Sequence, residues 1–380
     1  MQNVKSLKEI YTEYCFALIA ILFSGWIAIY PYSGYLILLL TVLIILLNFS
    51  TLKVFLHVCI TGLITAYFLM PREYGPPNSA WLLSLYSFAA LIFLKDGQLN
   101  HIFSKYVKIL VFLCFASIAQ RILMFFLDLP YFFVDLNPQF FNVYWPFYLE
   151  RTNISIGDVD QIIGTYRFHG PFFEPGALGY ALGISLFGSN SKKILVSIFF
   201  FGILSLSAAF IVISFIYVVE KLIIRGNYYP VILAILFIFI LYFSLDKDSF
   251  FYNSTFGRFL GESDKVLNTR TSVFEQEQIE LFKKIIFENP LELLFGIGFD
   301  LPGSGGSYRV WLLSTGIIFQ LIYFPFFLYL IKKLCNMRVK QMFFRLLVVS
   351  LIFYILGNWL SIIFIFLFCK FNQNAKPTIS

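Results

Sequence analysis

The chain carries little charge for its length, since only 13% of its 380 residues are Asp, Glu, Lys or Arg. A soluble domain carries about twice that fraction, so the composition excludes an ordinary soluble globular protein. Hydrophobic residues make up 59% of the chain, and phenylalanine alone occurs 49 times. Because aromatic rings pack among lipid tails and at membrane interfaces, this composition predicts a polytopic helical membrane protein.

Motifs for metal, nucleotide or disulfide chemistry are also lacking. The sequence contains no CxxC pair, no HExxH and no GxxxxGK[ST], so we expect no metal, no cofactor and no ATP-driven pump. All five cysteines lie in predicted spans or on the lysine-rich side of them, which predicts an outward face without disulfides. No cleavable signal peptide is expected, because residues 14–30 lack a small-residue cleavage site.

Apolar runs of about 20 residues cross a bilayer as helices, and they define the expected fold. The runs are residues 16–30, 35–49, 54–70, 80–94, 107–127, 172–187, 194–205, 208–224, 230–245, 308–331 and 344–369. A hairpin at 357–359 would divide the last run in two. We therefore expect an all-α integral membrane protein with 11 or 12 transmembrane helices, forming one domain over residues 1–380.

Lysine and arginine gather on one side of these spans, which carries 15 basic and 4 acidic residues. The positive-inside rule makes this side cytoplasmic, together with the N-terminus. Basic residues at both ends of 194–224 predict a hairpin that turns near 205–207. The net charge of +7 is thus attributed to topology, and no nucleic-acid partner is expected.

Two long segments, 128–170 and 246–307, face outward in this topology. The aromatic residues of the first form either an interfacial belt or a platform for stacking on sugar rings. The second contains an amphipathic helix that starts with a capping box at Ser272 and stops at Asn289-Pro290. The glycine-rich run after it is either a plain connector or a nest of amides for a phosphate.

The most unusual polar segment is the end of the first outward loop, where Arg167, His169 and Glu174 stand within eight residues. Pro175 is predicted to be the first residue of the next helix, so Glu174 lies where peptide dipoles favour an anion. Charge at membrane depth is costly and is usually retained for a task. A helix cap combined with an arginine that anchors to lipid headgroups is the alternative.

Arginines suited to a lipid-linked diphosphate recur on the outward side. Five are candidates for one site: Arg151, Arg167, Arg258, Arg270 and Arg309. Arginine presents a planar fork that matches phosphate oxygens, whereas the alternative is that each one pairs with a loop carboxylate. Arg121, inside a span, faces the same cavity, snorkels to the interface or pairs with Asp128. His169 is the single outward histidine and a candidate proton acceptor.

These motifs resemble those of bacterial O-antigen or capsule repeat-unit polymerases, to which the O-antigen ligases are related. In that family an arginine followed by G-x-x-x-E-P opens a helix after an outward loop, as do Arg167, Gly170, Glu174 and Pro175 here. The later family pattern is matched in order by Arg270, Asn289-Pro290, Gly296, Gly298, Tyr308-Arg309 and Gly316. Ligases commonly have His-Asn in place of Tyr308-Arg309, which favours a polymerase. The turn at 205–208 also departs from the family, because it lacks the usual serine–arginine pair.

The resemblance implies a membrane-embedded glycosyltransferase that uses a polyprenyl-diphosphate sugar as donor. Taken together with the outward arginines and His169, it leads us to expect catalytic roles for Glu174, His169, Arg167 and Arg270. We expect substrate binding by Arg258, Tyr308, Arg309, Arg151 and Arg121. The implied location is the bacterial cytoplasmic membrane. The implied partners are a polyprenyl-diphosphate-linked oligosaccharide, membrane lipids, a flippase and a chain-length regulator. A ligase, a polysaccharide flippase and a structural partner of a synthase complex are the competing interpretations.

The orientation is testable with cysteine substitutions in the two long outward segments. We expect Asn153→Cys and Ser263→Cys to react with an impermeant thiol reagent in intact spheroplasts, because both segments are predicted to be extracytoplasmic. Labelling that appears only after the membrane is opened would reverse the orientation.

Overall fold

A computed structural model describes most of residues 6–224 and shorter stretches from residue 280 onward. The described residues are 6–24, 33–70, 79–136, 139–144, 147–151, 168, 170–172, 175–189, 191–205, 207–224, 280–281, 283–285, 287–288, 290–298, 308–335, 342, 345–346, 349 and 363–369. For 79–81, 132–143, 149–151, 175–176, 208, 223–224, 308–311, 335 and 363–364 the description covers the backbone alone.

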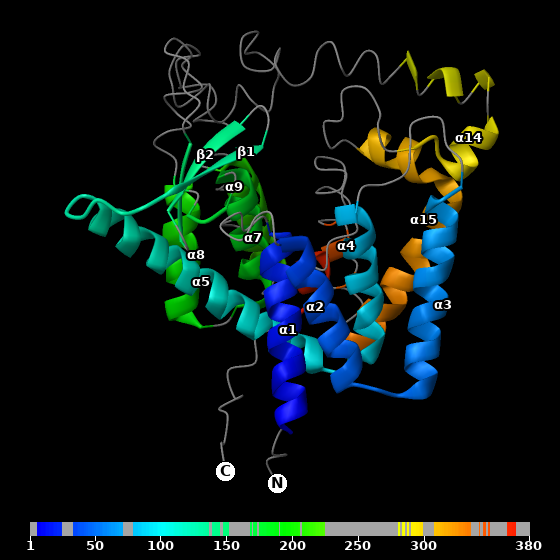
Figure 1. Ribbon diagram of the computed structural model, residues 1–380, viewed down its shortest axis with the longest axis horizontal. Helices are drawn as coiled ribbons and strands as arrows, with labels where there is room; N and C mark the ends of the chain where they lie inside the picture. The colour runs from blue at the N-terminus through cyan, green and yellow to red at the C-terminus, as the bar shows by residue number, and fades with distance from the viewer. Residues whose placement is uncertain are drawn as a thin grey trace.

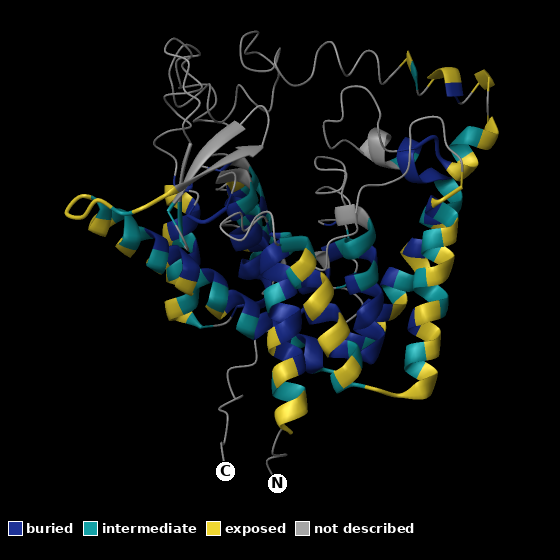
Figure 2. Cartoon of the chain, in the orientation of Figure 1, coloured by how far each residue is buried: buried dark blue, intermediate teal, exposed yellow. Residues whose placement is uncertain are grey.

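Helices make up most of the described structure (Figure 1). They are α1 (Leu7–Phe23), α2 (Ser33–Leu47), α3 (Thr51–Phe68), α4 (Ser79–Ala89) with the 3-10 turn η2 (Ala90–Phe93), α5 (Gln98–Met124), α7 (Pro175–Gly188), α8 (Lys192–Leu204), α9 (Ala208–Ile224), α14 (Pro290–Phe295), α15 (Tyr308–Cys335) and α17 (Ile363–Phe366). Buried residues are concentrated in α1, α5 and α7, whereas α3 exposes much of its surface (Figure 2).

Three of the described helices are long enough and apolar enough to cross a membrane. They run over Thr51–Phe68, Gln98–Met124 and Leu312–Leu334, and shorter apolar helices cover Ser33–Leu47, Leu82–Phe93 and Ala177–Gly188. A mainly helical fold is therefore confirmed, with three described helices whose length and composition suit a membrane span. The predicted span 230–245, and all of 344–369 except short pieces, lie outside the described residues.

The predicted helix boundaries need correction where charged residues continue a helix beyond the apolar run. The span predicted at 107–127 belongs to α5, which already starts at Gln98. Lys105 forms a 2.8 Å ion pair with Glu13 of α1, whose side chain is 1% exposed. Because the pair neutralises both charges, these helices continue together past the apolar run.

A small antiparallel sheet stands in the first outward segment, and the expectation of an all-α chain did not include it. Its strands are β1 (Phe132–Leu136), β2 (Gln139–Tyr144) and β3 (Tyr148–Arg151). They form a meander in the order β1-β2-β3, with Val134 opposite Phe141 and Val143 opposite Leu149. Aromatic and β-branched residues favour strands, so the aromatic run forms a sheet.

The predicted hairpin at 205–207 is confirmed, because α8 ends at Leu204 and α9 begins at Ala208. Glycines let the helices around this hairpin approach closely. A Cβ built on Gly202 of α8 would lie 2.1 Å from the Phe210 ring of α9. In α7, which packs against α9, a Cβ on Gly179 would lie 2.2 Å from the Cβ of Ser207. Small residues at helix contacts are typical of membrane bundles.

Arg345 holds several helix ends together. Its side chain is 3% exposed, and its Nε donates to the Oε1 of Glu220 in α9 at 3.1 Å. Its terminal nitrogens donate to the carbonyl oxygens of Phe187, Leu367 and Cys369. The last carbonyls of a helix have no partner within the helix, so Arg345 satisfies the end of α7 while it pairs with α9.

The end of α14 packs against a break in α15. Gly316 has φ 77° and ψ 162°, values outside the helical region. A Cβ there would lie 2.4 Å from the carbonyl carbon of Phe295, at the end of α14. The hydroxyl of Tyr67, from α3, donates to the carbonyl oxygens of Phe295 and Thr315 at 2.9 and 2.7 Å. The break therefore lets α14 pack closely on α15, and Tyr67 bonds both helices to α3.

The prediction that Asn289-Pro290 stops the amphipathic helix is only partly right. The described residues between 280 and 288 are helical, but Pro290 is also the first residue of α14. Proline suits this position because the first helical N–H needs no partner within the helix. On the preceding segment Ile285 is buried whereas Lys283 and Lys284 are exposed, as an amphipathic helix requires.

The close contact between α7 and α9 is testable by adding a single methyl group. We expect Gly179→Ala to destabilise the protein by about 1–3 kcal/mol, because the helices must separate. The measurement is thermal unfolding of purified protein in detergent. Gly62→Ala is the matched control, since nothing lies within 4 Å of a Cβ there, and it should leave the melting temperature unchanged or raise it. Equal melting temperatures for both variants would contradict the packing.

Candidate functional site

Most residues predicted for the site lie outside the described part of the chain. These are Arg167, His169, Glu174, Arg258 and Arg270. For Arg151, Tyr308 and Arg309 the backbone is described, which places Arg151 at the end of β3 and the other two in the first turn of α15. Tyr308 therefore opens a helix, as predicted.

The described part of the predicted motif is a buried turn that leads into α7. Gly170 has φ 58°, in the left-handed region that favours glycine. The N–H of Phe168 donates to the carbonyl oxygen of Leu204 at 3.1 Å, and its ring stacks on Phe201 with centroids 5.7 Å apart. Pro175 is the first residue of α7, which confirms the predicted helix start. The turn is thus attached to the end of the α8–α9 hairpin.

Ser117 of α5 lies on the other side of this turn. A Cβ built on Gly170 would lie 3.6 Å from the Oγ of Ser117. Ser117 is fully buried, and among the described residues its hydroxyl has no hydrogen-bond partner. Leaving a buried hydroxyl unpaired costs about 1–3 kcal/mol. A polar group that enters beside the turn would recover part of that cost.

Arg121 follows Ser117 by four residues, which places both on one face of α5 about 6 Å apart along the axis. Its guanidinium lies over the ring of Tyr148 in β3, with 5.6 Å from Cζ to the centroid. Within the described residues no carboxylate is paired with it, so the alternative of an Asp128 pair is not formed. Stacking uses the face of the guanidinium and leaves its N–H edge for an anion.

Gln120 attaches the sheet to α5 beside Arg121. Its Nε2 donates to the carbonyl oxygen of Tyr144, and its Oε1 accepts from the N–H of Phe147, each at 3.0 Å. One side chain therefore bonds both sides of the β2–β3 connection. The contact positions Tyr148 under Arg121, which brings the sheet over the same end of α5 as the buried turn.

The glycine-rich run near α14 does not form the amide nest that was one of its two interpretations, as far as the run is described. The N–H of Gly296 donates to the carbonyl oxygen of Glu292, and that of Ile297 donates to Leu313, each at 2.7 Å. Gly296 and Gly298 are buried, with φ 80° and 121°. These amides already have partners, so this part of the run is a packed connector.

Arg121 was predicted from the sequence and Tyr148 was predicted as part of the aromatic run, whereas Ser117 and Gln120 were not predicted. A spacing of four residues on one helix face points from Arg121 to Ser117. No comparable signal links Gln120 or Tyr148 to the site, because their contacts depend on a strand turn 24 to 27 residues away along the chain.

Comparisons with known proteins do not extend the resemblance. A scan against protein-family models matches no family, and searches of the curated proteins and of the solved structures find no similar protein.

The attachment of the sheet is testable by hydrogen exchange. We expect Gln120→Leu to speed exchange of residues 139–151, because both bonds to the β2–β3 connection are lost. Each bond is worth about 0.5–1.5 kcal/mol, so protection should fall about two- to tenfold per bond. Gln120→Glu keeps the acceptor for Phe147 and should have roughly half the effect. Unchanged exchange in Gln120→Leu would show that the sheet is held by other contacts.

Proposed function

We propose that this chain is a membrane-embedded glycosyltransferase that polymerises lipid-linked oligosaccharide repeat units. It transfers a growing glycan from polyprenyl diphosphate to the next lipid-linked unit, in the synthesis of an O-antigen or capsule. The proposal rests on the motifs that resemble those of repeat-unit polymerases. It also assigns the protein to the bacterial cytoplasmic membrane, with its N-terminus in the cytoplasm.

The observation that best supports this proposal is the arrangement around the buried turn. Ser117 and Arg121 stand on one face of α5, and Ser117 contacts Gly170 of the turn. The motif residues Arg167 and Glu174 flank that turn in the sequence. Their backbone is therefore within a few residues of an unpaired hydroxyl and a cation. Such a group of donors suits an anionic leaving group at the membrane surface.

In the proposed reaction the acceptor hydroxyl oxygen attacks the anomeric carbon of the donor sugar. The bond from that carbon to the diphosphate oxygen breaks, and the diphosphate leaves with the electron pair. Arg167 and Arg270 stabilise the charge that develops on the diphosphate. Glu174 takes the proton of the acceptor hydroxyl, with His169 as the other candidate base.

The remaining predicted residues bind substrate in this proposal. Arg121 and Arg151 lie at the sheet, and Tyr308 and Arg309 open α15 beside the second outward segment. Arg258 belongs to that second segment. A flippase would supply the lipid-linked units and a chain-length regulator would limit the product, so both are proposed as partners.

The role of Glu174 is tested by Glu174→Gln in purified enzyme at saturating lipid-linked donor. If Glu174 is the base, the rate should fall about 10²–10⁴-fold, because glutamine cannot take a proton. A helix cap alone predicts a stability loss of about 0.5–1 kcal/mol with activity nearly unchanged. The matched control is Glu288→Gln, which removes an exposed carboxylate from the second outward segment. A Glu174→Gln rate within about threefold of the native rate would remove Glu174 as base and leave His169.

Two further measurements separate the other interpretations. Arg167→Ala should abolish polymer formation, and Arg167→Lys should restore it only in part, because a point charge lacks the bidentate fork.

In a deletion strain, a single attached repeat unit identifies a lost polymerase, whereas intact polymer on its carrier lipid identifies a lost ligase. Normal polymer in that strain would contradict both.

A further inference from the structure

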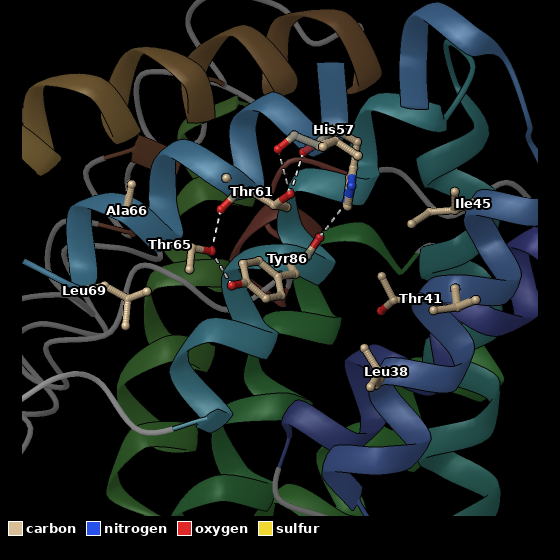
Figure 3. Close-up of a pocket in the computed structure, with 12 residues that line it drawn as sticks. Leu38, Thr41, Ile45, His57, Thr61, Thr65, Ala66, Leu69 and Tyr86 are labelled. Carbon is tan, nitrogen blue, oxygen red and sulfur yellow. Dashed lines mark hydrogen bonds between the residues drawn. The ribbon is translucent and has the colours of Figure 1, made fainter. Parts of the chain in front are cut away.

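A groove lies between α2 and α3, lined by other residues than the site described above (Figure 3). Its volume is about 570 Å³, and Tyr86 of α4 forms part of its floor. Leu38 and Val42 line the α2 wall, and Val58 lines the α3 wall; all three side chains are exposed. At Gly62, also in the wall, nothing lies within 4 Å of a Cβ, so the groove is open there.

The polar side chains in the groove already have partners. The hydroxyl of Thr61 donates to the carbonyl oxygen of His57, and that of Thr65 donates to Thr61, at 2.8 and 2.7 Å. The imidazole Nε2 of His57 lies 3.3 Å from the carbonyl oxygen of Tyr86 (Figure 3). Since these groups bond to backbone, the threonines present methyl groups to the groove. A hydrocarbon chain fits this lining better than a sugar or an ion.

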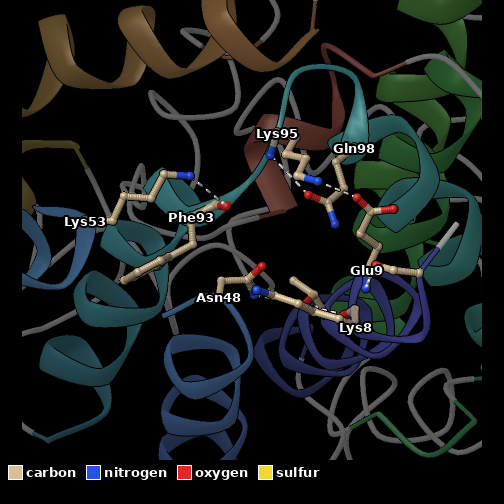
Figure 4. Close-up of polar contacts among 9 residues, drawn as sticks. Lys8, Glu9, Asn48, Lys53, Phe93, Lys95 and Gln98 are labelled. Atoms are coloured by element: carbon tan, nitrogen blue, oxygen red, sulfur yellow. Dashed lines mark hydrogen bonds and ion pairs between the residues drawn. The ribbon is translucent and has the colours of Figure 1, made fainter. Parts of the chain in front are cut away.

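Lysines gather at one end of the groove. Lys53 precedes His57 by four residues, so it continues the same face of α3. Its Nζ donates to the carbonyl oxygen of Phe93 at 3.4 Å (Figure 4). Lys8 and Lys95 stand at the same end of the helices as Lys53 (Figure 4). Glu9 pairs with Lys95 at 2.5 Å, and Asp96 follows Lys95 in the sequence, so three lysines and two carboxylates belong to this end.

We propose that this groove binds an anionic phospholipid of the lysine-side leaflet, with its phosphate at Lys53 and one acyl chain between α2 and α3. Basic pockets between transmembrane helices on the cytoplasmic side bind anionic headgroups. The charge at one end and the apolar lining along the rest match a molecule with a charged head and a long tail. This inference does not depend on the proposed function.

The position of the lysines argues against the lipid-linked donor as the occupant. The connection from α2 to α3, which precedes Lys53, lies at the opposite end of the molecule from the sheet and α14 (Figure 1). The diphosphate of a donor would sit near the sheet and the buried turn, whereas the groove presents its lysines at the other end. The bound lipid is therefore a component of the surrounding membrane.

The test is thermal unfolding of the full-length, delipidated protein in detergent, with dioleoyl phosphatidylglycerol or dioleoyl phosphatidylcholine added. The two lipids share acyl chains and differ in headgroup charge. We expect phosphatidylglycerol to raise the melting temperature more than phosphatidylcholine. Lys53→Gln should weaken phosphatidylglycerol binding about fivefold, which is the effect of one lysine near a charged lipid surface. Lys192→Gln is the matched control, because Lys192 is an exposed lysine at the start of α8.

A second variant, Gly62→Leu, fills the groove with a side chain that meets no protein atom near its Cβ. It should reduce the stabilisation by either lipid and leave the lipid-free melting temperature unchanged or raised. Equal stabilisation of the native protein by both lipids would overturn the proposal, as would identical behaviour of Lys53→Gln and Lys192→Gln. If light scattering shows that the native protein is a dimer and that Gly62→Leu is a monomer, the groove binds a second copy of the chain instead of a lipid. A large loss of lipid-free stability in Gly62→Leu would assign it to another segment of this chain.

Discussion

The described bundle depends on the buried guanidinium of Arg345. A charge in a membrane-embedded core is tolerated when it is paired and hydrogen-bonded, and Arg345 meets Glu220 and the carbonyl oxygens of Phe187, Leu367 and Cys369. It therefore holds the C-terminal end of α7 against α9 and the segment that precedes Cys369. At the middle of α7, Gly179 and Gly183 leave no room for side chains against α9. Because α7 is positioned at its C-terminal end and along its length, Pro175 and the buried turn are placed at its N-terminal end.

The outward side is attached to the bundle by a few polar side chains. Gln120 of α5 bonds to backbone groups of Tyr144 and Phe147 in the β2–β3 connection. Tyr67 of α3 bonds to the carbonyl oxygens of Phe295, at the end of α14, and of Thr315, before the break in α15. Each side chain bonds backbone groups of another segment of the chain. The sheet is thus attached to α5, and α14 is attached to α3.

Some predictions from the sequence were accurate because they depend on local chemistry. Proline at a first helical position placed the start of α7 at Pro175, and basic residues at both ends of a long apolar stretch placed the α8–α9 hairpin. The aromatic run at 131–148 was interpreted as a belt or platform, yet it pairs as strands. Strand pairing is a contact between segments, so composition alone did not distinguish a sheet from an interfacial loop. Of the predicted site residues, only Arg121 has a described side chain, and its stacking partner was unforeseen.

The sequence by itself determined the helical fold and the long apolar helices, because both follow from hydrophobicity along the chain. The side of the membrane assigned to each end of these helices stays a prediction from the distribution of lysine. Arg345 and Glu220 were interpreted as separate charges that set topology, but the tertiary structure joins them across 125 residues. The unpaired hydroxyl of Ser117, the kink at Gly316 and the groove beside Lys53 were likewise decided by how helices approach one another. Such features depend on side chains that meet in space from distant parts of the chain, and no local pattern encodes which ones meet.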